Sequence, residues 1–527
     1  MVKQALKGFE SHFGINGKRQ IGLFWLFLCL FCAYSAFVAY AQCICRSIEG
    51  GFNTLFFAVL ALLLGVIAVW CFAAIKTKEA TERNSLHGLF FATFIAVLTF
   101  SVFYYWQRGF YPGSFSPDSI VQYEQVQNGK YNDWHPFLHT LLFFGVPNIF
   151  SDSPALTVTL QIVWFSLALG YLFYVLYTEG CGIIACALCW LYLAANPNTL
   201  LIMLYPWKDS AFSILSTVVF SFLIRIFKSR GEWLLRVRNL MAFSAFSFLA
   251  LSVRHNAVML IAPIFAILFF AFKKLRKEVL ISAVSLVLLT FLVKVPVFSA
   301  FGVESPNHRV AEVVGLPMTL LADIYMEDRR ALPDDARAFL DSLATQENWK
   351  KYHTHGSFNS FKWSDEEISF KIDEQGTIRI LDYAYRSANA SPKVAKRSLF
   401  DLTKMVWGAG VGGGWQIGYG ITRNDFGIAA QYTKDEIKPF TEYRNAINGG
   451  VFGYLFNYTG VIILLILAIS ISRIGKNGAY GLFAAIPLVI YDFGTMLLLT
   501  GHDFRFFHLN FMLVIPILYV AFACKSD

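Results

Sequence analysis

The segment FLHTLLFFGVPNIF, residues 137–150, decides how the chain threads a membrane. It is apolar but only about 14 residues long, whereas a helix needs about 20 apolar residues to cross the hydrocarbon core. If it crossed, every later segment would be inverted, and several clusters of basic residues would move to the outer face. We therefore predict that it forms a re-entrant or interfacial helix on the outer face.

The composition is typical of a membrane protein. Of the 527 residues, 56% are hydrophobic and 15% are charged, whereas a soluble domain carries about 25% charged residues. Repeated apolar segments of about 17 to 25 residues predict an all-α polytopic membrane protein with about 12 transmembrane helices. The net charge of +9 is expected to report orientation in the bilayer, not nucleic-acid binding. The expected spans are 21–43, 53–75, 87–106, 156–177, 182–203, 210–228, 239–254, 256–272, 279–299, 450–472, 477–499 and 506–523.

Basic residues occupy alternate connections between these spans, as the positive-inside rule requires. With twelve spans they all fall on one face, together with Lys525 and the basic residues of the N-terminus, so both termini are expected in the cytoplasm. The basic residues of these connections are Lys76, Lys78, Arg83, Lys228, Arg230, Arg236, Arg238, Lys273, Lys274, Arg276, Lys277, Arg473 and Lys476.

The distribution of polar residues divides the chain into four parts. Residues 1–84 are expected to hold a cytoplasmic segment and two spans, and residues 85–300 a transmembrane core with a polar outer loop at 107–155. Residues 301–449 are too charged to be embedded in a membrane and predict a small extracytoplasmic subdomain. Residues 450–527 are expected to form a C-terminal bundle of three spans.

Polar clusters far apart in the sequence fall at the same outer face under this topology. Because ionisable groups at membrane depth are costly, they tend to mark functional sites. We therefore expect these clusters to converge on one site. Its candidate residues are Asp118, Gln122, Asp133, Trp134 and His135 in the first outer loop, Lys208 and Asp209 in the second, Arg254, His255 and Asn256 in the third, and Arg505 in the last, where His502, Asp503 and His508 also lie.

Each cluster also has a structural explanation. Asp118 could be the N-cap of a short helix. Lys208 and Asp209 could form a local ion pair at a helix end. Arg254 and Arg505 could be interfacial anchors whose side chains extend to the lipid headgroups.

Taken together, the clusters describe a chemistry. A carboxylate in an outer loop can act as general base for a hydroxyl nucleophile. Arg and Lys side chains nearby can hold a phosphate and stabilise its developing charge, and the bilayer can deliver a substrate with a lipid tail. These three conditions predict a transferase that takes a sugar from a lipid phosphate.

The pattern PDS…Q…G.Y.DWHP at residues 117–136, followed by a short outer helix and by P…KD at 206–209, resembles the GT-C superfamily of integral-membrane glycosyltransferases. The resemblance is nearest to a poorly characterised bacterial branch and more distant to the phage-type O-antigen glucosyltransferases. It covers residues 85–300 and, loosely, the last three spans.

The resemblance implies a polyprenyl-phosphate or polyprenyl-diphosphate sugar donor, a glycan or glycolipid acceptor, and a site on the periplasmic face of the bacterial inner membrane. It implies that Asp118 is the general base of an inverting displacement and that Asp209 is the second acid. By their positions, Arg254 and Arg505 would hold the lipid phosphate.

The resemblance also implies a role for the end of the first loop. Asp133 and His135 would orient the acceptor or, in metal-dependent members, help to bind a divalent ion such as Mg²⁺ or Mn²⁺. This chain lacks a paired second acid beside Asp118 and has two additional spans before the core. Whether a metal is needed therefore stays open.

Three other functions fit parts of the pattern. A flippase or transporter for a lipid-linked sugar would be expected to show inverted repeats and charges near the midplane, and neither is evident in the sequence. A polysaccharide polymerase or ligase would share the many spans and the large outer loop. A receptor or scaffold would not need the polar clusters to converge. Turnover of a polyprenyl-phosphate sugar without translocation separates the transferase from the transporter.

Overall fold

The computed structural model describes residues 85–305, 309–407, 417–450, 452–498 and 503–525. The first two expected spans, 21–43 and 53–75, lie outside these residues. Within the described part the chain forms helices and only isolated β-bridges. The expectation of an all-α fold is therefore confirmed for the described residues.

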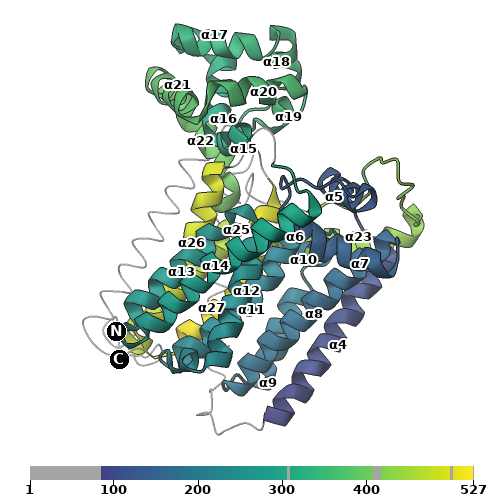
Figure 1. Ribbon diagram of the computed structural model, residues 1–527, viewed down its shortest axis with the longest axis vertical. Helices are drawn as coiled ribbons and strands as arrows, with labels where there is room; N and C mark the ends of the chain where they lie inside the picture. Colours follow the sequence, from purple (N-terminus) through teal and green to yellow (C-terminus); the bar gives the residue numbers. More distant parts are fainter. Residues whose placement is uncertain (1–84, 306–308, 408–416, 451, 499–502, 526–527) are drawn as a thin grey trace, which may run out of the picture.

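Long apolar helices form the body of the molecule (Figure 1). By length and composition, six helices of the described part are able to cross a membrane. The expected count of about 12 stays a prediction, because five further apolar stretches of the described part are shorter. The six are α4 (Ser85–Gly109), α8 (Pro154–Thr178), α11 (Lys208–Lys228), α14 (Arg276–Phe301) with the turn before it, α26 (Tyr480–Leu498) and α27 (Leu509–Ala523) with the turn before it, and the shorter stretches are residues 137–150, α9 (Ile183–Ala194), α12 (Val237–Val253), α13 (Val258–Ala271) with the turn before it, and Thr459–Ile471 within α25 (Thr459–Asn477).

Helix α11 lies at the centre of the bundle and is the most buried of the six. It packs against α8, α12 and α27, while α4 packs on the outer side of α8. Gly170 permits the close approach of α4 and α8, because a Cβ atom there would lie 3.0 Å from the backbone oxygen of Ala92. The charged residues at the start of α11 are thereby held in the interior of one end of the bundle.

The expected span 182–203 is wrong as a single helix. Helix α9 ends at Ala194, and a separate helix α10 (Pro197–Ile202) begins after Asn196. The Asn196 side chain caps α10 by accepting hydrogen bonds from the backbone of Asn198 and Thr199. A proline disfavours helical backbone in the residue before it, so the break falls between Ala194 and Pro197.

Residues 137–150 form one short, continuous helical segment at the same end of the bundle as the small subdomain (Figure 1). It consists of α6 (Phe137–His139), the π-helical turn η1 (Thr140–Gly145) and α7 (Val146–Phe150). It packs against α5 (Pro117–Asn128), α8 and α12. A position at the membrane interface remains the expectation for this segment.

A second hydrophobic core lies outside the bundle and is built by short helices between residues 311 and 395 (Figure 1). Helix α22 joins the two cores, because Ala395 belongs to the small core and Leu402 to the large one. The helices of this region are α15 (Arg309–Val313), α16 (Gly315–Glu327), η5 (Arg329–Ala331), α17 (Asp334–Leu343), α18 (Gln346–Tyr352), α19 (Asn359–Lys362), α20 (Glu366–Gln375), α21 (Thr377–Ala390) and α22 (Pro392–Trp407).

The chain after α22 returns to the bundle. Phe440 of α23 packs against Trp106 and Phe110 at the end of α4, with ring centroids 5.1 and 5.5 Å apart. Two isolated bridges hold the first outer loop, one from Phe115 to Ile421 and the other between residues 132 and 304. Of the remaining helices, only α23 (Lys434–Gly449) exceeds two turns. The others are η2 (Glu232–Leu235), η3 (His255–Ala257), η4 (Lys273–Leu275), α24 (Phe452–Asn457) and η6 (Phe504–Phe507).

Candidate functional site

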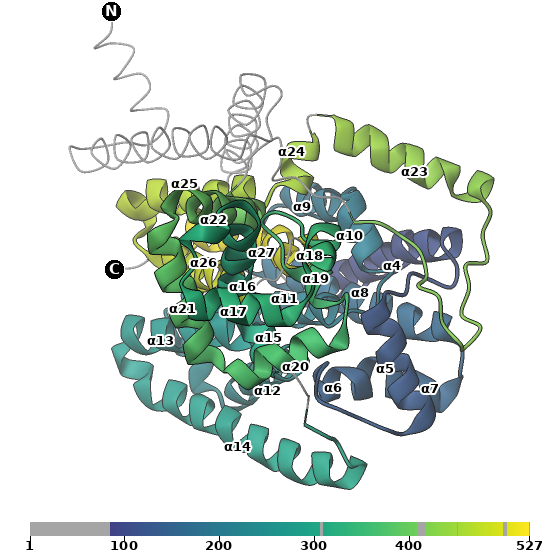
Figure 2. The ribbon, with the colours of Figure 1, turned by 90° about the horizontal axis from the view of Figure 1, so that it is seen from above.

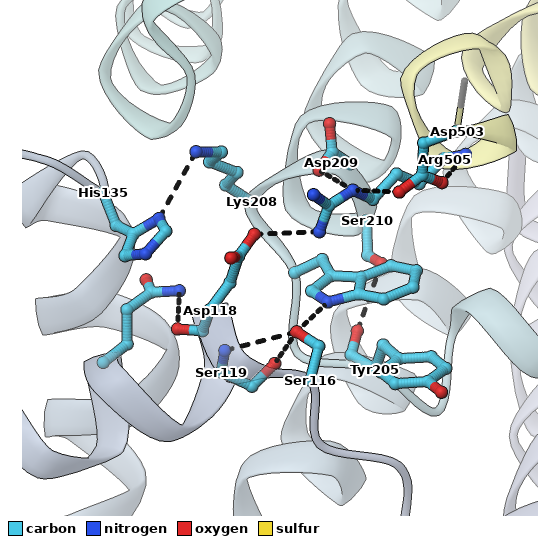
Figure 3. Close-up of polar contacts among 12 residues, drawn as sticks. Ser116, Asp118, Ser119, His135, Tyr205, Lys208, Asp209, Ser210, Asp503 and Arg505 are labelled. Carbon is cyan, nitrogen blue, oxygen red and sulfur yellow. Dashed lines mark hydrogen bonds and ion pairs between the residues drawn. The ribbon is translucent and has the colours of Figure 1, made fainter. Parts of the chain in front are cut away.

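Four connections at the end of the bundle that faces the subdomain bring charged side chains together. Asp118 comes from the first turn of α5, and Lys208 and Asp209 begin α11. Arg254 follows α12, and Arg505 lies in η6 before the last helix. Figure 3 shows Asp118 between Lys208 and Arg505. Residues almost 400 positions apart in the sequence thus meet in one cluster.

Ser116, not Asp118, caps helix α5, so the expected alternative role of Asp118 is wrong. The Ser116 hydroxyl accepts a hydrogen bond from the backbone N–H of Ser119 at 3.4 Å and another from the indole Nε1 of Trp207 at 2.7 Å. Pro117 at the first helical position needs no hydrogen-bond acceptor. The Asp118 carboxylate therefore projects from the first turn without a capping role.

Arg505 is the centre of the charged cluster. Its Nη1 donates to Asp118 Oδ2 at 2.8 Å, and its Nε lies 2.8 Å from Asp503 Oδ2. Its guanidinium stacks over the indole of Trp207, 5.0 Å from the ring centroid. Arg505 is thus held from several sides inside the protein, and the alternative of an anchor that extends to lipid headgroups is wrong.

Asp209 and Arg254 form an ion pair in which both side chains are buried. Arg254 also lies over the rings of Tyr491 and Phe506. The second carboxylate oxygen of Asp209 is 3.9 Å from Nε of Arg505. Asp209 therefore orients two guanidinium groups. Arg254 is paired with Asp209, so its expected role as a lipid anchor is wrong. The expected local ion pair of Lys208 with Asp209 is also wrong, because Lys208 contacts His135.

Lys208 contacts a histidine in place of a carboxylate. Its Nζ donates to His135 Nδ1 at 3.3 Å. Burial, followed by the nearby charge of Lys208, lowers the pKa of His135 to about 3. The imidazole is therefore neutral at pH 7, and since it accepts at Nδ1 its proton lies on Nε2. Within the described residues, Lys208 has no carboxylate within 4 Å, so its charge is available to a ligand.

Burial alone would raise the pKa of Asp118, but three neighbours outweigh it. The Arg505 guanidinium, His135 and Lys208 together hold the pKa of Asp118 well below its usual value. Its side chain is 31% exposed, so solvent and a ligand both have access to this carboxylate. Asp118 is ionised at neutral pH and is a weak base while Arg505 holds it.

The other expected residues of the first loop have mainly structural contacts. Gln122 is buried, and its Oε1 accepts from His139 Nδ1 at 2.6 Å, while its Nε2 donates to the backbone oxygen of Asp118 at 3.2 Å. Asp133 accepts from the backbone N–H of Phe137 at 2.9 Å and so caps the short helical segment. The carboxylate partners of Arg505 are instead Asp118, Asp209 and Asp503.

The third outer connection is only partly joined to the cluster. His255 Nε2 lies 3.0 Å from the backbone oxygen of Asp133, whose Oδ2 is 3.6 Å from the ammonium of Lys294. Asn256 lies beside His255 in η3 and is half-buried. His508 is buried and bonds to Thr199, whereas residue 502 lies outside the described part.

Several residues of this site were not expected from the sequence. Trp207 holds both Ser116 and Arg505, and its ring stacks on Tyr205 with centroids 4.0 Å apart. Its position directly before the Lys208–Asp209 pair was the available signal. Trp134 is an expected residue, but no local pattern near position 134 indicates its contacts with Trp363 and Lys362 of the small subdomain.

The described residues of the candidate site do not fit a divalent metal ion. Among the described residues, no group of three or more His, Cys, Asp or Glu side chains is arranged to hold one. Asp118 is paired with Arg505 and Asp133 with Lys294, whereas Mg²⁺ and Mn²⁺ need several free oxygen ligands. No step proposed below involves a metal.

No family model, curated protein or solved structure matches the chain. The GT-C assignment therefore stays a prediction from the residues of the first two outer loops.

Proposed function

We propose that the protein is an inverting glycosyltransferase that works at the outer face of a bacterial inner membrane. It transfers a sugar from a polyprenyl phosphate or diphosphate to a hydroxyl group of a glycan or glycolipid. The ion pair between Asp118 and Arg505 carries this proposal, because it joins a potential base to a potential phosphate ligand. The pair lies at the end of the apolar bundle that faces the small subdomain, and the Asp118 side chain is 31% exposed, which supports access from both sides.

The basic side chains of the cluster differ in how many carboxylates already bind them, and therefore in how readily they can bind a phosphate. Arg254 is bound to Asp209, and Arg505 is shared between Asp503 and Asp118. Among the described residues, Lys208 has only the neutral His135 as its close partner. Lys208 is therefore the first phosphate ligand in the proposed mechanism, and the guanidinium of Arg505 is the second.

Binding of the donor then prepares the base. The donor phosphate competes with Asp118 for the guanidinium of Arg505, and this competition frees the carboxylate. Because Arg505 lowers the pKa of Asp118, the freed carboxylate is a stronger base. The neutral imidazole of His135 keeps Lys208 oriented without neutralising its charge.

The transfer itself balances as a single displacement. The acceptor oxygen forms a bond with the anomeric carbon while its proton passes to the Asp118 carboxylate. The bond from the anomeric carbon to the phosphate oxygen breaks, and the phosphate leaves with the electron pair. Lys208 and Arg505 stabilise the negative charge that develops on this oxygen.

The test is the release of polyprenyl phosphate from a panel of polyprenyl-phosphate hexoses and a mixed glycan acceptor fraction, with purified protein. Loss of a general base lowers turnover by about 10²- to 10⁴-fold, so Asp118→Asn is expected to fall by at least about 100-fold. Glu124→Gln is the matched control, because Glu124 is an exposed acid on the same helix.

Two results would contradict the proposal. Undiminished turnover in Asp118→Asn would remove Asp118 from the mechanism. Movement of the intact lipid-linked sugar across a vesicle membrane without release of polyprenyl phosphate would favour the transporter.

A further inference from the structure

The first outer loop meets the small subdomain at a pair of indoles. Trp134 follows α5, and Trp363 directly follows α19, with ring centroids 6.1 Å apart and planes at 72°. Seen from above, α19 projects over the ends of α10 and α11 (Figure 2). The backbone N–H of Asp133 donates to the oxygen of Glu304 at 3.0 Å, which ties this part of the loop to the segment that enters the subdomain.

A buried ammonium lies beside both rings. Lys362 is 1% exposed, and its Nζ lies 4.7 Å from the ring centroid of Trp363 and 5.7 Å from that of Trp134. It forms an ion pair with Glu312 of α15. A buried ammonium needs such partners, because an isolated one would lose its hydration without compensation.

The charged cluster acts electrostatically on this lysine. Trp134 directly precedes His135, whose Nδ1 accepts from Lys208 at 3.3 Å. Burial lowers the pKa of Lys362, the charge of Asp373 opposes this, and smaller effects come from the charges of Lys208 and Asp118, with a net pKa of about 8. The indole pair therefore belongs to the surroundings of the charged cluster, on the side of the subdomain.

The two indoles differ in their exposure. The Trp363 side chain is 62% exposed, although its Nε1 donates to Asn359 Oδ1 at 3.1 Å and so fixes the ring. Trp134 is half-buried. A large aromatic side chain that is both exposed and held in one orientation is typical of a binding surface. The C–H face of a pyranose ring stacks on such an indole.

We propose that Trp363 and Trp134 form the subsite for a saccharide ring of the acceptor, and that Lys362 is the positioning residue that holds the two indoles together. This inference rests on the proposed glycosyltransferase function. The donor phosphate is assigned to Lys208 and Arg505 at the end of the apolar bundle. The acceptor hydroxyl must approach Asp118 from the other side, where the subdomain supplies the indoles.

The test is saccharide binding by the full-length protein in lipid nanodiscs without any donor. The probe is an array of bacterial and model oligosaccharides. Trp363→Ala is expected to weaken binding at least tenfold, and Trp363→Phe to retain most of it, because a phenyl ring still offers a stacking face. Trp164→Ala is the matched control, since Trp164 is 52% exposed but lies in the middle of α8.

The positioning role of Lys362 has its own readout. Lys362→Met is expected to raise the KM for the acceptor at least tenfold and to leave the KM for the donor unchanged, while Lys362→Arg restores acceptor affinity. A merely structural defect would lower kcat and raise both KM values together.

The outcomes separate this proposal from the function on which it rests. Binding by Trp363→Ala equal to the wild type, or no saccharide retained by the wild type, would overturn the subsite even if donor turnover is intact. Saccharide binding that depends on Trp363, together with no release of polyprenyl phosphate under any condition, would overturn the transferase and leave the binding site standing.

Discussion

Asp118 and Arg505 lie 387 positions apart in the chain, and the Asp118 carboxylate accepts a hydrogen bond from Arg505 Nη1 at 2.8 Å. The pair joins the connection between α4 and α8 to the one between α26 and α27, at the end of the bundle. Because the guanidinium of Arg505 already binds the Asp118 carboxylate, any anion that enters competes with Asp118 for Arg505. An arriving phosphate would therefore change the basicity of the group beside it, which links donor binding to activation of the base.

Removal of the guanidinium is expected to change both the rate and its pH dependence. Arg505→Gln loses a charge that stabilises the leaving phosphate, so kcat/KM is expected to fall by about 10²- to 10³-fold. Because Arg505 lowers the pKa of Asp118, its loss raises that pKa. The acid limb of the kcat/KM profile is then expected to move to higher pH.

The measurement is the pH dependence of polyprenyl phosphate release between pH 4 and 8. Arg108→Gln is the control, because Arg108 is an exposed arginine at the end of α4. An acid limb at the same pH in Arg505→Gln and in the wild type would break the link between Arg505 and the base.

The buried pair of Asp209 and Arg254 predicts an asymmetric effect on stability. Asp209→Asn leaves a buried guanidinium without its charged partner, which is expected to lower the free energy of unfolding by about 3–5 kcal/mol. The double variant Asp209→Leu/Arg254→Met removes both charges and is expected to recover most of this loss. Thermal unfolding in detergent micelles measures both, and a single variant as stable as the wild type would contradict the ion pair as described.

The N-cap of α5 is expected to affect turnover as well as stability. Ser116→Ala removes the acceptor for Ser119 N–H and for the Trp207 indole, and an N-cap loss costs about 1 kcal/mol. Because Asp118 lies two residues further on, the lost contacts also orient its carboxylate, and a rise of about 1 kcal/mol in the activation barrier would lower turnover about fivefold.

Thr345→Ala is the matched control for this variant. The Thr345 hydroxyl caps α18 in the subdomain in the same way, by accepting from Asn348 N–H at 3.3 Å. Its loss is expected to reduce stability by a similar amount but to leave turnover unchanged. Equal turnover in both alanine variants would show that the orientation of α5 does not matter for the chemistry.

Local patterns in the sequence were sufficient to predict the helical fold and most of the long helices. Apolar runs and the polar residues that interrupt them are local features, so the starts of α8 and α11 fall close to the expected positions. The division of the span 182–203 was missed because its two halves are both apolar. The break depends on Pro197 and on the capping side chain of Asn196, which the overall hydropathy of the segment conceals.

The pairing of side chains depends on tertiary contacts and was not predictable. The sequence shows Lys208 beside Asp209, yet their partners are His135 and Arg254, which lie in two other connections between helices. Since successive residues of a helix point about 100° apart, adjacent charges seldom meet. The contacts of Lys362 with the two indoles were not predictable for a related reason. They depend on how the small subdomain packs against the bundle.

His135 predicts a pH dependence of stability. Burial, followed by the charge of Lys208, lowers the pKa of His135 to about 3 in the folded protein, whereas the value in an unfolded chain is about 6.5. Between these pH values the unfolded chain binds a proton that the folded protein does not. The stability from the neutral ring is therefore complete above about pH 6.5 and is lost progressively as the pH falls toward about 3.

His135→Gln removes this titration while retaining a side-chain oxygen that can accept from the Lys208 ammonium. Its free energy of unfolding is expected to vary less with pH than that of the wild type between pH 4 and 6, by up to about 1.4 kcal/mol per pH unit. Unfolding in detergent micelles at several pH values measures the two slopes. His87→Gln at the exposed start of α4 is expected to keep the wild-type slope. Equal slopes for His135→Gln and the wild type would mean that His135 binds its proton equally well in the folded and unfolded states.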